Sequence, residues 1–234
     1  MAETEDEHWW FVGRRMIIEQ QLSALGLPSG AAILEVGAGT GGNLKMLSRY
    51  GAVSAMEMHP FAREHATRRS GIEVAEGYLP GNVPFSGKKF DLICLFDVLE
   101  HVREDADSLI VLKELLSSRG KIIITVPAYP LLWSDHDVAL HHFRRYTRRS
   151  LRKVIETSGL RVQKLSNFNT FLFPVATAAR GVASLLGTSS SPGSKMPSPL
   201  VNKLLLSIFS AERHILARAG LPFGLSLVAV AENA

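Results

Sequence analysis

The sequence is poor in cysteine and contains no apolar run long enough to span a membrane. Cys94 is the only cysteine among 234 residues, which excludes an intrachain disulfide framework and a zinc site built from cysteines. It stands within an apolar run, where a buried structural thiol is expected. The apolar stretch at residues 171–186 is brief and contains Pro174 and Arg180, so we expect no transmembrane segment.

Positive charge is missing from the start of the sequence. Acidic residues stand where a secretory signal peptide would be basic, namely Glu3, Glu5, Asp6 and Glu7, so a cytoplasmic location is expected. The net charge is +4, and six basic residues gather between Arg144 and Lys153. No aromatic-interleaved recognition module is present, so we expect an anionic substrate or a solvated helix surface there rather than nucleic acid.

Four glycines lie close together between residues 37 and 42, directly after an apolar run. Residues 31–43 read AAILEVGAGTGGN, a pattern that predicts a buried parallel strand over 31–36 followed by a sharp turn. Glycines let the backbone turn and approach a ligand without a Cβ in the way. Thr40 is expected to cap a helix over 41–49, whose free N–H groups favour an electronegative ligand group. The stretch therefore predicts a small-molecule site.

The glycine pattern alone leaves the ligand open. Gly37, Gly39 and Gly42 satisfy the G-x-G-x-x-G pattern of dinucleotide-binding proteins. Glu57 ends the next apolar run, where a carboxylate accepts hydrogen bonds from ribose hydroxyls. A nicotinamide dinucleotide and S-adenosylmethionine (SAM) both fit these residues.

Strands and helices alternate through most of the chain. We expect strands at 31–36, 52–57, 72–75, 90–96, 121–126, 161–168 and 225–231, and helices at 5–26, 41–49, 60–70, 104–117 and from 148 to about 158. This alternation predicts a parallel sheet with helices on both faces and a ligand at the carboxyl ends of the strands. A helix opened by Ser198-Pro199 follows the apolar stretch and a Ser/Pro-rich linker, and we interpret this region as a helical cap, a dimer contact or a lipid-contacting surface.

The segment around the fourth predicted strand resembles a known family. FDLI at 90–93 and FDVLEH at 96–101 are similar to the post-strand-four motif of class I SAM-dependent methyltransferases, and EVGAGTG at 35–41, Glu57 and Glu76-Gly77 match it in order and spacing. The flanks at 8–11, 135–146 and 222–227 resemble a bacterial subset called methyltransferase type 11. The resemblance implies a Rossmann-like, seven-stranded mixed α/β sheet, with the last strand inserted antiparallel between the fifth and sixth.

The same resemblance implies a cofactor site and three segments of the chain. Residues 31–170 and 221–234 would form the SAM-binding core, with residues 1–30 as an N-terminal aromatic cap and 171–220 as a helical insertion. Glu35 would reach the cofactor ammonium, Glu57 the ribose hydroxyls, and Met58 the adenine ring. Tyr78 stands where many relatives carry Asp. The full set of implied cofactor-binding residues is Glu35, Gly37, Ala38, Gly39, Gly41, Glu57, Met58, Gly77, Tyr78, Asp97 and Val98.

The acceptor side is predicted from ionisable and aromatic residues. Methyl transfer from a sulfonium needs an aligned acceptor and exclusion of water, and a base only when the acceptor loses a proton. We expect His101, His136 and His142 to be catalytic, although His101 could instead cap the next loop. Expected acceptor contacts are Trp9, Trp10, Arg144, Arg145 and Tyr146. Asp135, His136, Asp137 and His142 lack a recognised ligand spacing, so no metal is expected.

The acceptor-side residues favour O-methylation of a small acceptor with a hydrophobic, aromatic or lipid-like part. We expect the protein to be a monomer or a homodimer. Contact with a membrane surface stays open at this point. Two alternatives remain at this point. An NAD-dependent oxidoreductase would explain the glycines and Glu57 but not the FDVLEH stretch. A non-catalytic SAM-binding or membrane-surface protein would explain the apolar region after residue 170.

Overall fold

The computed structural model describes residues 4–174, 177 and 196–234. Within these residues the chain forms a seven-stranded sheet in the order β3-β2-β1-β4-β5-β7-β6. The pairs β5·β7 and β6·β7 are antiparallel and the others parallel, which confirms the predicted topology. The strands are β1 (Ala31–Val36), β2 (Gly51–Glu57), β3 (Val74–Glu76), β4 (Phe90–Phe96), β5 (Leu116–Pro127), β6 (Leu160–Phe168) and β7 (Ser226–Asn233).

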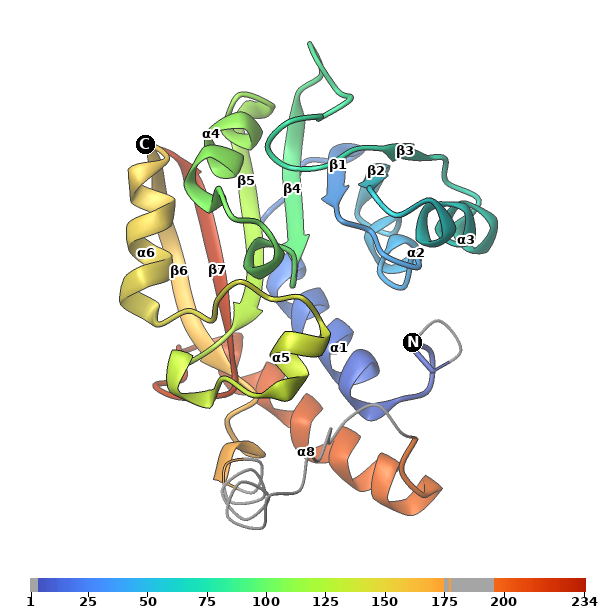
Figure 1. Cartoon of the computed structure of the whole chain (residues 1–234), viewed down its shortest axis with the longest axis vertical. Helices are drawn as coiled ribbons and strands as arrows, with labels where there is room; N and C mark the ends of the chain where they lie inside the picture. The colour runs from blue at the N-terminus through green and yellow to red at the C-terminus, as the bar shows by residue number, and fades with distance from the viewer. Residues whose placement is uncertain (1–3, 175–176, 178–195) are drawn as a thin grey trace.

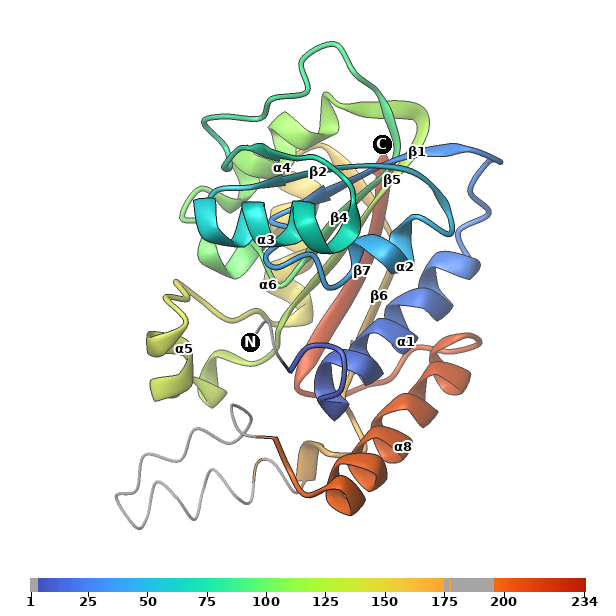
Figure 2. The same cartoon turned by 90° about the vertical axis from the view of Figure 1, so that its right-hand side faces the viewer.

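Helices cover both faces of the sheet. The described α-helices are α1 (Trp9–Ser23), α2 (Leu44–Leu47), α3 (Pro60–Ser70), α4 (Asp105–Lys113), α5 (Asp135–Ala139), α6 (Arg148–Thr157) and α8 (Pro199–Leu216), with 3-10 turns η1 (Leu99–His101) and η2 (Pro130–Leu132). Helices α1 and α8 lie side by side in both views, with the Trp9 amide bonded to the Asn202 side chain at 2.8 Å (Figures 1 and 2). Helix α5 lies beyond the carboxyl ends of β4 and β5 (Figure 1). No helix among the described residues is both long and apolar enough to cross a membrane.

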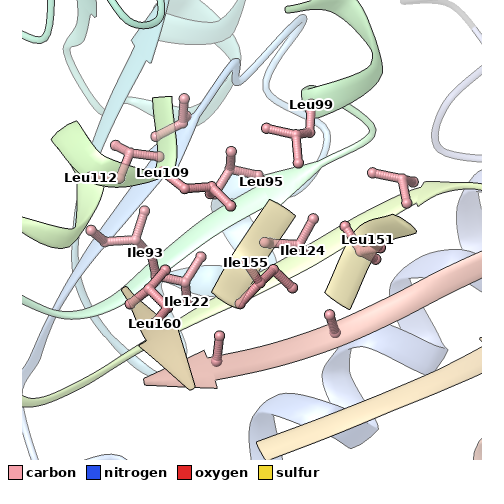
Figure 3. Packing of buried hydrophobic residues seen from close by; sticks show 14 of the residues in the cluster. Ile93, Leu95, Leu99, Leu109, Leu112, Ile122, Ile124, Leu151, Ile155 and Leu160 are labelled. Atoms are coloured by element: carbon pink, nitrogen blue, oxygen red, sulfur yellow. The ribbon is translucent and has the colours of Figure 1, made fainter. Parts of the chain in front are cut away.

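The two faces of the sheet are buried in separate cores. Along β4, Ile93 and Leu95 pack with residues of α4 and α6 (Figure 3), whereas Leu92 and Cys94 pack with residues of α1 and α8. A strand alternates its side chains between faces, so a run without polar residues is buried on both. The predicted buried thiol of Cys94 is confirmed, and burial raises its pKa.

The ends of several helices differ from the prediction. Helix α2 spans only residues 44–47, because Gly41 has a positive φ of 83° and its amide closes a tight turn onto the Ala38 carbonyl at 2.9 Å. Asn43, not Thr40, is the N-cap residue. Strand β5 takes in Leu116, which pairs with Phe90 and so shortens the helix predicted over 104–117. Most of the predicted apolar segment and its linker lie outside the described residues.

Candidate active site

The loop after β1 has a backbone that only glycine adopts readily. Gly37, Gly39 and Gly41 have φ values of 68°, 54° and 83°. A Cβ on Gly37 would lie 2.7 Å from Val98 Cγ2, and one on Gly41 would lie 2.9 Å from the Ala66 Cα. Apart from the residues next to it in the chain, no described residue lies within 4 Å of the corresponding point on Gly39. The loop is therefore packed on two sides and open at Gly39.

Glu57 at the end of β2 is held in place by backbone amides. Its Oε2 accepts from the Gly39 amide at 2.9 Å, and its Oε1 accepts from the His59 amide at 2.8 Å. A carboxylate oxygen has two lone-pair sites, so each oxygen still has one to offer. Glu57 thus joins the glycine loop to the second strand and can accept from a diol.

Glu35 lies in the middle of the site at the end of β1. It is buried, and its Oε1 accepts from the Asn43 side chain at 2.8 Å. Within the described part of the chain, Oε2 has no hydrogen-bond partner. Burial raises the pKa of Glu35 to about 7, although the Asn43 bond lowers it. An ammonium group would satisfy the second oxygen and favour the charged form.

Asp97, directly after β4, connects α1 to the site. Its φ is 57°, a conformation that costs a non-glycine residue roughly 1–3 kcal/mol. Oδ2 accepts from the Arg14 guanidinium and Oδ1 from the Thr125 hydroxyl at 3.2 Å. The Arg14 guanidinium also stacks 4.9 Å from the ring of Trp10. These bonds hold the strained residue in place.

These residues form what we call the cofactor half of the site. Its members are the loop residues 35–41, Glu57, Met58, Gly77, Tyr78, Asp97 and Val98. Met58 and Tyr78 follow β2 and β3 and are 68% and 52% exposed, which leaves their apolar surfaces free to contact a ring. The open backbone at Gly39, the unpartnered Glu35 oxygen and the free lone pairs of Glu57 fit the ribose and amino-acid ends of SAM.

The acceptor half of the site comprises η1 and residues 134–146. The rings of His101 and His142 meet edge-on with centroids 4.6 Å apart. Nδ1 of His142 is 2.9 Å from Asp137 Oδ1, and Arg145 donates to both oxygens of Asp137 at 2.7 and 2.9 Å. Burial raises the pKa of Asp137, but the hydrogen bonds from His142 and Arg145 outweigh it and hold that pKa well below its usual value.

Glu100 is a residue of this half that the sequence reasoning missed. It is 1% exposed, and among the described residues neither of its side-chain oxygens has a hydrogen-bond partner. Burial, followed by the neighbouring charge of Asp97, raises its pKa well above the usual value. Desolvation and the adjacent His142 lower the pKa of His101. The sequence offered one indication of this role: Glu100 stands directly before His101, shortly after the apolar run that forms β4.

The remaining predicted acceptor residues have partners inside the protein. Trp9 packs edge-on against Phe209 of α8, with ring centroids 5.7 Å apart. Arg144 and the Tyr146 hydroxyl both donate to Asp105, at 2.7 and 2.9 Å. The fork of Arg145 is occupied by Asp137, and His136 lies half-buried on α5. Contacts of Trp9, Trp10, Arg144, Arg145, Tyr146 and His136 with an acceptor therefore stay predictions.

A scan against protein-family models matches residues 12–165 to the methyltransferase domain. The mitochondrial ubiquinone biosynthesis O-methyltransferase of Schizosaccharomyces pombe is 32% identical over 111 residues, which cover 44% of this chain and 40% of that protein. The demethylmenaquinone methyltransferase of Tropheryma whipplei (strain Twist) is 28% identical over 131 residues, covering 54% of this chain and 51% of that protein. The matches thus span about half or less of these relatives.

A solved structure shares the fold across nearly the whole chain. The TehB-like SAM-dependent methyltransferase from Corynebacterium glutamicum superposes with a TM-score of 0.55 at 19% identity, covering 92% of this chain and 87% of that one. The chain belongs to the methyltransferase domain family. Its family and its fold are those of class I SAM-dependent methyltransferases. The family match favours a methyltransferase over the oxidoreductase alternative.

Proposed function

We propose that this enzyme methylates an oxygen atom of a small molecule that carries a hydrophobic, aromatic or lipid-like part. The observation that carries the proposal is the contact between His101 in η1, just after Asp97 and Val98, and His142 from the loop after α5. A hydroxyl acceptor loses a proton during methyl transfer, and a histidine near its oxygen can accept that proton. SAM would supply an electrophilic methyl group.

The protein would bind the cofactor with the residues of the cofactor half. Glu57 accepts from the ribose diol, Glu35 faces the ammonium group, and Asp97 and Val98 border the methionine end. Arg14 holds Asp97, so α1 closes this side of the site against water. Helices α1 and α8 form the cover of the acceptor pocket in this proposal, α8 being the main described part of the 171–220 segment.

Exposed apolar side chains near the site favour an apolar acceptor. Trp133 and Phe143 are 42% and 43% exposed on either side of α5, and the Arg103 guanidinium lies 4.3 Å from the Phe143 ring centre. A shallow apolar cavity of about 670 Å³ is lined by Phe173, Pro174, Thr177 and Phe223. The fission-yeast relative is an O-methyltransferase of ubiquinone biosynthesis, and this similarity supports a quinone-like phenol.

A radiolabelled methyl-transfer assay tests this proposal. A panel would pair each lipid-tailed catechol or phenol with its tail-free counterpart and with its O-blocked ether. We expect methylation of the free hydroxyl, with a lower KM for the tailed compound. Methylation of the ether on a ring carbon would show that carbon and not oxygen is the accepting atom. Turnover restricted to amines would overturn the oxygen assignment.

The proposal extends to the setting of the enzyme. We place it in the cytoplasm of a bacterium, acting on a small molecule rather than on nucleic acid, as a monomer or homodimer with peripheral membrane contact. The similarity of the flanks at 8–11, 135–146 and 222–227 to a bacterial subset supports the bacterial assignment. Exposed Leu200, Val201 and Leu204 on α8 support a hydrophobic contact surface.

A further inference from the structure

Glu100, His101 and His142 bring three possible metal ligands together at the carboxyl end of β4. One ligand atom of each side chain lies within 4.8 Å of the other two. Glu100 and His101 belong to η1, whereas His142 belongs to the loop after α5. The Phe143 amide donates to the Glu100 carbonyl at 2.8 Å and so joins the two segments. The cluster is thus fixed by the backbone on both sides.

The Glu100 carboxyl is the group that needs a ligand. It is almost fully buried, and no described residue bonds either of its oxygens. A buried polar group without a partner costs about 1–3 kcal/mol, and more when it is charged. The two nearby guanidinium groups already bond other carboxylates: Arg14 donates to Asp97 and Arg145 donates to Asp137. A bound cation would supply the missing positive charge.

His142 is oriented as a ligand would be. Its Nδ1 faces the Asp137 carboxylate at 2.9 Å, which favours a proton on Nδ1 and leaves the lone pair on Nε2. A carboxylate that bonds the far nitrogen of an imidazole is the usual outer partner of a metal-bound histidine. Arg145 holds Asp137 in turn from a second direction. His101 is exposed, so the cluster is open on one side.

We propose that Glu100, His101 and His142 bind a divalent transition-metal cation, Zn²⁺ in preference to Mg²⁺ or Ca²⁺, with an open position for an oxygen of the acceptor. Two imidazoles and one carboxylate are a common ligand set of catalytic zinc, in which a fourth position is left for water or substrate. Mg²⁺ and Ca²⁺ prefer oxygen ligands throughout. This set of ligands shares only His142 with the group of Asp135, His136, Asp137 and His142, for which no metal was expected from the sequence.

The reactive role of the cation rests on the proposed function, whereas the binding of the cation does not. A hydroxyl bound to Zn²⁺ loses its proton more readily, as bound water does. The acceptor O–H bond would break with release of the proton to solvent. The oxygen would then form its bond to the methyl carbon as the C–S bond of the sulfonium breaks, leaving a neutral thioether and a methyl ether.

Metal titration of the full chain tests the site without any acceptor. Protein stripped with a chelator would be titrated with Co²⁺, followed by its visible absorption and by equilibrium dialysis, and then with Zn²⁺ as competitor. We expect one Co²⁺ per chain, displaced by Zn²⁺. Glu100→Gln and His142→Ala should each weaken binding by about 100-fold. Glu104→Gln and His214→Ala, which change exposed residues, should bind as the wild type does.

Binding of S-adenosylhomocysteine to each variant shows that it is folded. Failure of the wild type to bind Co²⁺ or Zn²⁺, or equal binding by the Glu100 and His142 variants, would overturn the site. Metal binding without methyl transfer to any hydroxyl would retain the site and overturn the proposed function. Undiminished O-methylation by metal-free enzyme would retain the proposed function and overturn the reactive role of the cation.

Discussion

The two halves of the site treat their buried carboxylates differently. In the cofactor half, Glu57 accepts from two backbone amides and Glu35 from the Asn43 side chain, all within the β1–β2 region. In the acceptor half, neither oxygen of the Glu100 carboxyl has a described partner, although Asp137 has several. The bonds to Glu35 and Glu57 are therefore local and leave one Glu35 oxygen for a ligand, whereas the acceptor half combines η1 with the loop around α5 and leaves a whole carboxyl without a partner.

His142→Ala should have the largest effect, because it should impair the acceptor half and leave the cofactor half intact. We expect kcat for O-methylation to fall by about 1000-fold, because the group that activates the hydroxyl is lost, while SAM affinity stays unchanged. Single-turnover rates and calorimetric titration would measure the two effects separately. His214→Ala serves as the control on α8. An equal loss of SAM affinity would show that the halves are not independent.

Arg145→Ala tests how much the buried Arg145–Asp137 ion pair of the acceptor half stabilises the fold. Arg145 and Asp137 are buried, so we expect removal of the guanidinium to destabilise the fold by about 3 kcal/mol. Arg152→Ala breaks an exposed pair with Glu156 at 3.2 Å and should cost less than about 1 kcal/mol. Urea unfolding measures both. A stable Arg145 variant with a raised KM would instead assign that side chain to the acceptor.

Glu57→Ala tests the cofactor half. The loss of the diol acceptor and of two amide bonds should weaken SAM binding by about 100-fold, equal to about 2.7 kcal/mol. Metal binding by the acceptor half should not change. Calorimetry with S-adenosylhomocysteine measures the first, with Glu64→Ala on the exposed face of α3 as the matched carboxylate control. Retained affinity would mean that a different group holds the ribose.

Glu35 should give the smallest effect, seen as a pH dependence. Its pKa of about 7 arises from burial, and only the charged form attracts an ammonium group, so SAM affinity should rise about tenfold from about pH 6 to pH 8. The unfolded chain loses this proton at lower pH than the folded one, so the free energy of unfolding should decrease as the pH rises from about 4.5 to about 7 and level off above that. Glu35→Gln should flatten both profiles. Unchanged profiles would exclude Glu35 as their source.

The parts of the fold that follow from local pattern were predicted well. Apolar runs placed β1, which is bounded by glycine, and β4, and the glycine spacing predicted the turn after β1. The short α2 was missed because its start depends on a positive φ at Gly41. Glu100 was missed because its importance arises when η1 meets the α5 loop. No periodicity in either segment reports that contact.

The position of β7 governs when the sheet can be completed. It lies between β5 and β6 and pairs with both along nearly its whole length. During synthesis, residues 116–127 and 160–168 emerge long before residues 226–233, so β5 and β6 lack the strand that pairs with both of them. Before β7 pairs, the segment of residues 134–146, which lies between β5 and β6 in the chain, has only an incomplete sheet beside it. We therefore expect the acceptor half to be completed after the strands that carry the cofactor half have paired.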